Sequence, residues 1–382
     1  MTGSADERQT AWPELFLDLV FAFGLTEIAA LAHQELLNGL GLARTLVVLV
    51  PLYWAWVGTS VHVNTHGVET DRDRLGIFAI ALCALFMALS IPSAFAGRSV
   101  LFAASYLALR AIVVLLVAGG KKMDIRPFLV SVIVTGPLLL MGAFLTPVQL
   151  PIWGLAAVTD LSTPLVLRRV LIETHFDPQH LPERFGSFIL VALGESIIAI
   201  GLPAASARHL EPAVIVAVAV SFVLVSSLWW LYSSFGAPDA ARQLAQATAQ
   251  TDVVRQAFAY GHLFLAAAVI SISVGFRAIV TAPDRHLGLG VTAMFLGGIA
   301  VYVASIGITT WPHQHRKSSI DLAGAAVVAA VIPAATITSG LIVLEVASLT
   351  VILAVAGNHV NDSQAGRSSL AASGTPQGRT TG

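Results

Sequence analysis

Two acidic residues lie deep inside segments of this sequence that are otherwise apolar enough to enter a lipid bilayer. Glu27 and Glu195 stand 13 and 12 residues beyond the acids that open their segments, about 18–20 Å along a helix. A charged side chain near the bilayer centre costs about 2.5–3.5 kcal/mol. We therefore expect each carboxyl group to be protonated, paired or turned toward a hydrated cavity, and both are candidates for substrate or proton binding.

Three further acids lie at the starts of the same two segments. Glu14 and Glu183 each follow a proline, an order typical of a helix start, where an acid complements the positive end of the helix dipole. We interpret both as helix-start residues at the membrane interface. Asp18 lies one turn beyond Glu14 and is a candidate for substrate or proton binding, or for an ion pair. The corresponding position of the second segment is Ser187, so this acid belongs to one segment alone.

An arginine, an aspartate and a histidine complete the ionisable residues at membrane depth. Arg110 and Asp160 each fall near the middle of an apolar segment. A central arginine keeps its charge and needs an acid partner, for which Asp160, Glu27 and Glu195 are the candidates. His262 is suited to proton transfer near neutral pH or to a hydrogen-bonded place in the core. If these five residues serve one site, they must converge on a common cavity.

The densest polar stretch, residues 62–73, offers little for metal chemistry. His62 and His66 stand four residues apart and acids follow them, which is compatible with a divalent cation. Because no cysteine or fixed third ligand accompanies them, we interpret the stretch as a solvated loop and predict neither a metal nor another cofactor. Four tryptophans near the ends of their segments are interpreted as interfacial belt residues, namely Trp54, Trp56, Trp229 and Trp230.

Composition predicts how these residues are held. Of 382 residues, 56% are hydrophobic and 11% are charged, against about 25% charged in soluble domains. Apolar runs of about 20 residues recur without strand-like alternation and are predicted to be membrane-spanning helices. We predict an all-α, polytopic transmembrane bundle of about 12 spans, namely 14–33, 43–62, 76–95, 99–118, 128–146, 148–167, 183–202, 211–235, 253–281, 288–310, 320–338 and 340–357.

Several alternatives are excluded or left open at this stage. The net charge of −1 gives no electrostatic case for nucleic-acid binding. The single cysteine, Cys83, excludes an intrachain disulfide. The break before Gly340 is tight, so a re-entrant hairpin over 320–357 is an alternative to two spans.

Lysine and arginine predict the orientation in the cell membrane. With a cytoplasmic N-terminus, 15 of the 21 basic residues fall in cytoplasmic segments and 5 outside, while Arg110 stays within the membrane. An even number of spans then places both termini in the cytoplasm. The predicted parts are a cytoplasmic N-terminal segment (1–13), a first six-helix half (14–167), a second six-helix half (168–357) and a disordered cytoplasmic tail (358–382).

The two halves share a sequence pattern. Pro13, Glu14 and Phe16 recur as Pro182, Glu183 and Phe185 at an offset of 169, and Glu27 recurs as Glu195 at 168. Corresponding spans are six apart and therefore share their orientation. We predict a parallel 6+6 duplication, of the type related by an axis along the membrane normal.

Four motifs carry a resemblance to a known family. They are ELFLDLVF (14–21), ERFGSFILVALGES (183–196), Trp229-Trp230 with Tyr232, and Tyr260-Gly261-His262. In this order the chain resembles the bacterial low-temperature-requirement A family over most of its length to about residue 310, with Leu17 where the family more often has Phe. The resemblance implies a multi-pass membrane protein named for growth at low temperature, and it implies no particular biochemical activity.

The deep acids favour a secondary transporter among three hypotheses. A small molecule or ion would bind between the halves, with Glu27 and Glu195 as gates or proton sites. An enzyme acting on a lipid or isoprenoid-like substrate would instead gather acids such as Asp71 and Asp73 at one interface. A non-catalytic component of cold adaptation is the third hypothesis. The lipid bilayer is the one partner that the sequence assigns, and it assigns no substrate, coupling ion or oligomeric state.

Overall fold

The computed structural model describes residues 12–35, 39–68, 70–119, 123–311 and 315–373. In these residues the regular structure is helical, apart from an isolated antiparallel bridge between His286 and Ser339. The helices are α1 (Trp12–Gln34), α2 (Gly41–His66), α3 (Asp71–Ser90), α4 (Ser99–Ala118), α5 (Arg126–Val130), α6 (Gly136–Phe144), α7 (Gln149–Val166), α8 (Arg168–Leu171), α9 (His180–Ser206), α10 (Pro212–Leu231), α11 (Ala237–Gln246), α12 (Gln250–Val253), α13 (Gly261–Thr281), α14 (Leu289–Thr310), α15 (His315–Ala335) and α16 (Gly340–Ser373).

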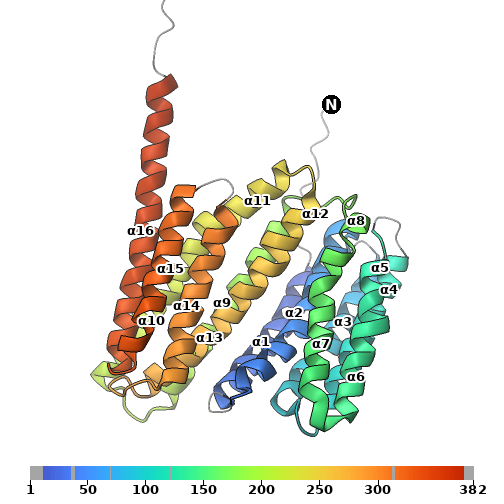
Figure 1. Ribbon diagram of the computed structural model, residues 1–382, viewed down its shortest axis with the longest axis horizontal. Coiled ribbons are helices and arrows are strands. Elements are labelled where there is room, and N and C mark those ends of the chain that lie inside the picture. Colours follow the sequence, from blue (N-terminus) through green and yellow to red (C-terminus); the bar gives the residue numbers. More distant parts are fainter. Residues whose placement is uncertain (1–11, 36–38, 69, 120–122, 312–314, 374–382) are drawn as a thin grey trace, which may run out of the picture.

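The long helices run back and forth through one bundle. Eleven helical segments of the described chain are long and apolar enough to cross a membrane, which confirms the predicted all-α, polytopic fold. The predicted span 148–167 forms α7, an 18-residue helix that includes Asp160 and is not among the eleven. Figure 1 shows that α1 begins and α16 ends at the same end of the bundle, which we call the N-terminal end. The 6+6 duplication stays a prediction.

Short π-helical segments interrupt three of the spans. η2 (Ser131–Thr135) joins α5 to α6, η4 (Tyr232–Gly236) joins α10 to α11, and η5 (Val254–Tyr260) joins α12 to α13. Two of them end two residues before a proline, Pro137 and Pro238. Proline lacks the N–H that would close the preceding turn, so that turn widens without ending the helix. The helix that contains the predicted span 211–235 therefore continues past residue 235, to Gln246.

The last two predicted spans are separate helices rather than a re-entrant hairpin. α15 and α16 each contain a segment long and apolar enough to cross a membrane. Their connection is fixed to the loop after α13, since the amide of Gly340 donates to the Arg285 carbonyl (2.9 Å) and that of Leu341 to the Pro283 carbonyl (3.0 Å).

The predicted disordered tail starts too early in the chain. α16 continues through Ser373, and residues 374–382 lie outside the described residues. Two polar residues in its extension have partners on other helices. Asn358 is fully buried and donates to Asp321 of α15 (2.8 Å), while the indole of Trp230 on α10 donates to His359 (2.9 Å). These contacts hold the helix together beyond the apolar run that the prediction followed.

The centre of the bundle is built around α2. In its most apolar stretch, 89% of the residues are buried, and α2 contacts α1, α4, α7, α9 and α13. Trp56 is fully buried and packs on Phe188 of α9, with ring centroids 4.1 Å apart. A belt residue would face lipid, but α2 is surrounded by other helices. The interpretation of Trp54 and Trp56 as interfacial belt residues is therefore wrong.

Candidate functional site

An ion pair joins α1 to α9 near the N-terminal end of the bundle. The guanidinium of Arg184 donates to both oxygens of Asp18, at 2.7 and 2.8 Å. The indole N–H of Trp56 donates to the same carboxylate at 2.8 Å. Both charged side chains are 1% exposed. A buried carboxylate needs this number of donors, since desolvation otherwise outweighs the attraction between the charges.

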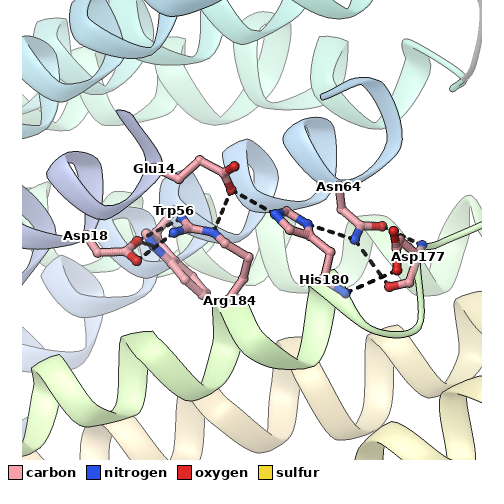
Figure 2. Close-up of polar contacts among 7 residues, drawn as sticks. All are labelled: Glu14, Asp18, Trp56, Asn64, Asp177, His180 and Arg184. Atoms are coloured by element: carbon pink, nitrogen blue, oxygen red, sulfur yellow. Dashed lines mark hydrogen bonds and ion pairs between the residues drawn. The ribbon is translucent and has the colours of Figure 1, made fainter. Parts of the chain in front are cut away.

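A second acid extends this group of residues, which Figure 2 shows and which we call the Asp18 cluster (Glu14, Asp18, Trp56, Asn64, Asp177, His180 and Arg184). The Nε of Arg184 forms an ion pair with Glu14 (3.1 Å), and the Nε2 of His180 lies 3.2 Å from the same carboxylate oxygen. Glu14 is 3% exposed. One arginine therefore binds both acids at the start of the first segment.

Asn64 of α2 sets the tautomer of His180. Its side-chain oxygen accepts the amide of Asp177 (3.0 Å), so its nitrogen faces Nδ1 of His180 at 3.2 Å. An amide nitrogen can only donate, which leaves Nδ1 as acceptor and the proton of a neutral imidazole on Nε2, facing Glu14. The carboxylate of Asp177 in turn accepts the amides of Gln179 and His180 at 2.9 and 3.1 Å. The start of α9 is thereby fixed to both α1 and α2.

Glu183 has a different environment from Glu14, although both follow a proline. Its side chain is exposed and lines an open cavity of about 840 Å³ between α9 and the α10–α11 segment. Trp229 and Tyr232 form part of the opposite wall. The neighbours of each helix, and not the local motif, decide which of these two acids is buried.

The two deep acids lie near each other on the opposite half of the same helices. Glu195 of α9 is 3% exposed, and the side chain of Thr26 on α1 is its nearby hydroxyl. Its electrostatic neighbours include Glu27 of α1 and Arg277 of α13. Glu27 is half-buried and interacts electrostatically with Arg98. The contact between α1 and α9 thus has the Asp18 cluster toward one end and a pair of acids toward the other.

Arg110 and Asp160 belong to a separate cluster among α4, η2 and α7. Asp160 is fully buried and accepts hydrogen bonds from the hydroxyls of Ser131 (2.8 Å), Thr135 (2.9 Å) and Tyr106. Arg110 donates to the hydroxyl of Ser131 and to the carbonyl of Trp54 (3.2 Å). Of the three acids considered for Arg110, Asp160 is therefore the one connected to it, through the bridging hydroxyl of Ser131.

His262 occupies a third location, in the second part of the chain. Its Nδ1 faces the carbonyl of Ala257 at 3.0 Å, and its Nε2 lies 2.8 Å from the hydroxyl of Tyr232. The carbonyl can only accept, so Nδ1 carries the proton and Tyr232 donates to Nε2. Phe185 and Phe258 pack on the imidazole. Tyr232 connects this buried histidine to the wall of the open cavity.

The sequence-predicted residues therefore do not converge on one cavity. Glu27 lies with Glu195, Arg110 with Asp160, Asp18 with Arg184, and His262 with Tyr232. Two of these groups include residues of π-helical segments, since Ser131 and Thr135 belong to η2 and Tyr232 belongs to η4. Such segments frequently occur at functional sites.

The interpretation of the stretch 62–73 as a solvated loop is wrong for its first part, because residues 62–66 end α2 and His62 and Asn64 are buried between helices. The rings of His62 and His66 lie 4.6 Å apart, and Asp73 forms a capping box with Thr70 at the start of α3. Within the described part of the chain, no group of three or more His, Cys, Asp or Glu side chains is arranged to hold a metal ion.

Sequence reasoning missed most partners in the Asp18 cluster. The sequence pattern assigned no partner to Arg184, and it favoured the interpretation of Trp56 as a belt residue. The available signal was the arginine in the motif ERFG, one residue from Glu183 in a segment that pairs with the one containing Asp18. An arginine buried at this position keeps its charge and therefore requires acid partners.

The helical fold and the buried ion pairs at membrane depth define an all-α, multi-pass integral membrane protein. The chain belongs to the family described as bacterial low temperature requirement A protein (LtrA), whose family model matches residues 9–356. The predicted resemblance is thus confirmed. The chain is 26% identical over 335 residues to the uncharacterized protein RA0937 of Rhizobium meliloti (strain 1021). The aligned region covers 82% of this chain and 81% of the relative. No solved structure matches the chain.

Proposed function

We propose that this protein is a secondary transporter in which Glu195, beside Glu27 at the contact between α1 and α9, binds the coupling proton. The observation that carries the proposal is the burial of Glu195 beside the hydroxyl of Thr26, without an ion-pair partner within 4 Å among the described residues. An anionic carboxylate in that environment is strongly disfavoured, whereas a protonated one is tolerated. The side chain of Thr26 and the charge of Arg277 offset part of this cost, while the nearby Glu27 adds repulsion to a second negative charge.

The Asp18 cluster supports a role as the closed gate of such a transporter. Arg184 and Glu195 lie 11 residues apart in α9, about 16 Å along the helix. Between them the contact with α1 includes the buried apolar residues Phe21, Leu25 and Phe188. The Asp18 cluster would seal the N-terminal end in this conformation, and its separation would expose the acids to that side. Alternating access requires a change of this kind.

A polar route past the open cavity supports the same interpretation. Tyr232 lines the cavity and donates to His262 of α13. Further along α13, Ser273 forms a hydrogen bond with Ser196 of α9 (3.2 Å), directly beside Glu195. Polar groups thus recur along the α9–α13 contact from the cavity toward the deep acids. With the bias of basic residues, the N-terminal end, which contains the Asp18 cluster and the cavity, would face the cytoplasm.

The test is proton movement driven by solute. The full-length protein would be reconstituted in liposomes that enclose a pH-sensitive dye, and pools of carboxylic acids, amino acids, sugars and alkylammonium ions would be added. We expect at least one pool to move protons in a protein-dependent manner. Glu195→Gln should abolish this movement, while Glu211→Gln, which changes an exposed acid outside the open cavity, should preserve it.

Two outcomes would contradict the proposal. One is a folded wild-type protein that moves neither solute nor protons with any pool. The other is a Glu195→Gln variant that retains the proton movement of the wild type.

A further inference from the structure

A small cavity separate from the deep acids lies between elements of the two predicted halves. Its volume is about 90 Å³. Trp54 and Gly58 of α2 and Phe128 of α5 line it from the first half, and Leu171 and Phe176 line it from the second. Most of the wall is apolar, and two arginines, one from each half, complete it.

The first of these arginines is Arg110 of α4, which is 3% exposed. Its two terminal nitrogens donate to the carbonyl of Trp54 and the hydroxyl of Ser131. Its Nε has no acceptor among the described residues. Gly58 makes the approach possible, because a methyl group at that position would overlap Nη1 of Arg110.

The second is Arg255 of η5, which is 9% exposed. Its Nη2 forms an ion pair with Asp252 (3.1 Å), whereas its Nε and Nη1 have no acceptor in the described chain. Asp252 is shared with the exposed Arg168, which donates to it from Nε at 2.8 Å. Because a second nitrogen of Arg168 also donates to Asp252, Arg168 and Arg255 compete for the same carboxylate.

Positive charge therefore exceeds negative charge around the cavity. Arg110 and Arg255 are the charged residues in its lining, which contains no acid. The nearby Asp252 is shared with Arg168, and Asp160 reaches Arg110 only through Ser131. Buried N–H groups of a charged guanidinium are costly to leave without acceptors. Two arginines on one cavity supply the donor arrangement that recognises carboxylates and phosphates.

We propose that this cavity binds an oxyanion, a carboxylate or phosphate group, between Arg110 and Arg255. The volume suits a small head group, and the apolar remainder of the wall accommodates a hydrocarbon part attached to it. The group can belong to a soluble anion or to an anionic lipid, and its chemistry is the same in both cases. The site does not depend on Glu195 or on coupled transport.

Binding of defined probes to the full-length protein in detergent tests the site. Inorganic phosphate and acetate represent soluble oxyanions and would be measured by calorimetry. Phosphatidic acid and oleate represent lipid oxyanions and would be measured by native mass spectrometry against phosphatidylcholine. We expect saturable binding of at least one oxyanion probe. Binding confined to the lipid probes would identify a lipid source, and binding confined to phosphate or acetate a soluble one.

Variants assign the binding to the cavity. Arg255→Gln should weaken it about tenfold or more, as expected for the loss of hydrogen bonds between charged groups. Arg255→Lys, which retains the charge, should weaken it less. Arg74→Gln removes an exposed arginine that pairs with Asp71 and should leave it unchanged.

A further variant separates binding from folding. If Arg255→Gln fails to fold, Gly58→Ala provides the decision, because it keeps both arginines and displaces the guanidinium of Arg110. It should weaken binding. The proposal is overturned if no oxyanion probe binds better than phosphatidylcholine or chloride, or if binding is equal in the wild type and these folded cavity variants.

Discussion

Arg184 of α9 binds Asp18 of α1 through two hydrogen bonds of 2.7 and 2.8 Å across 166 positions of the sequence. The pair is excluded from solvent, and Trp56 of α2 donates to the same carboxylate. Side chains of α1, α2 and α9 are therefore joined by hydrogen bonds to the carboxylate of Asp18. Separation of this pair would leave an arginine buried with Glu14 as its remaining acid partner.

Asp18→Asn should destabilise the protein strongly. The substitution keeps the size of the side chain but removes the negative charge that faces Arg184. Loss of one partner of a buried ion pair typically costs about 3–5 kcal/mol, and the remaining contact with Glu14 places the expected value near the lower limit. Equilibrium unfolding in mixed detergent micelles measures the change.

Glu183→Gln is the matched control for Asp18→Asn. It removes one negative charge from an exposed side chain one residue before Arg184, and exposed charges contribute little. If both variants had the same free energy of unfolding, the buried ion pair would contribute no more to stability than an exposed charge.

Asp160→Asn should destabilise the contact between η2 and α7. The carboxylate accepts from Ser131, Thr135 and Tyr106, and an amide cannot accept all three bonds. Since hydrogen bonds to a charged group contribute about 1.5–3 kcal/mol each, we expect a loss of about 3 kcal/mol. Ser162→Ala in the same helix removes a hydroxyl that donates to its own helix backbone (2.6 Å). It should have little effect, and a comparable loss there would contradict the assignment.

The sequence predicted the fold from local properties and missed the partners that depend on distant contacts. Span length and composition are local, and these revealed the polytopic bundle. Glu14 and Glu183 share the same local motif, yet one is buried against Arg184 and the other lines an open cavity. Arg110 needed an acid by electrostatics alone, and the choice of Asp160 depended on how α4, η2 and α7 pack.

A single site for all the deep ionisable residues was the hypothesis that packing could not support. Glu27 and Glu195 are near each other because α1 and α9 pack together. His262 is held by Tyr232 within the second part of the chain. The position of a residue along its span predicts its depth in the membrane. Depth alone does not determine which helices are neighbours.

Gly275→Ala should destabilise the contact between α13 and α14. A Cβ at residue 275 would overlap the ring of Phe295, which is fully buried. Overpacking of this kind typically costs about 1–3 kcal/mol. Gly297→Ala is the matched change in α14, where an added Cβ meets no atom within 4 Å. It should be neutral or stabilising by up to about 1 kcal/mol through helix propensity. Thermal unfolding of both variants compares them, and the reverse order would exclude the proposed packing.

Protonation of Glu195 is the property on which the proposed coupling depends, and isotope-edited infrared spectroscopy of the reconstituted protein measures it most directly. With labelled glutamate at neutral pH, we predict a band of a protonated carboxyl group that disappears in Glu195→Gln and persists in Glu183→Gln. A spectrum without a protonated glutamate band, or one that Glu195→Gln leaves unchanged, would contradict the assignment of Glu195 as the proton-binding residue.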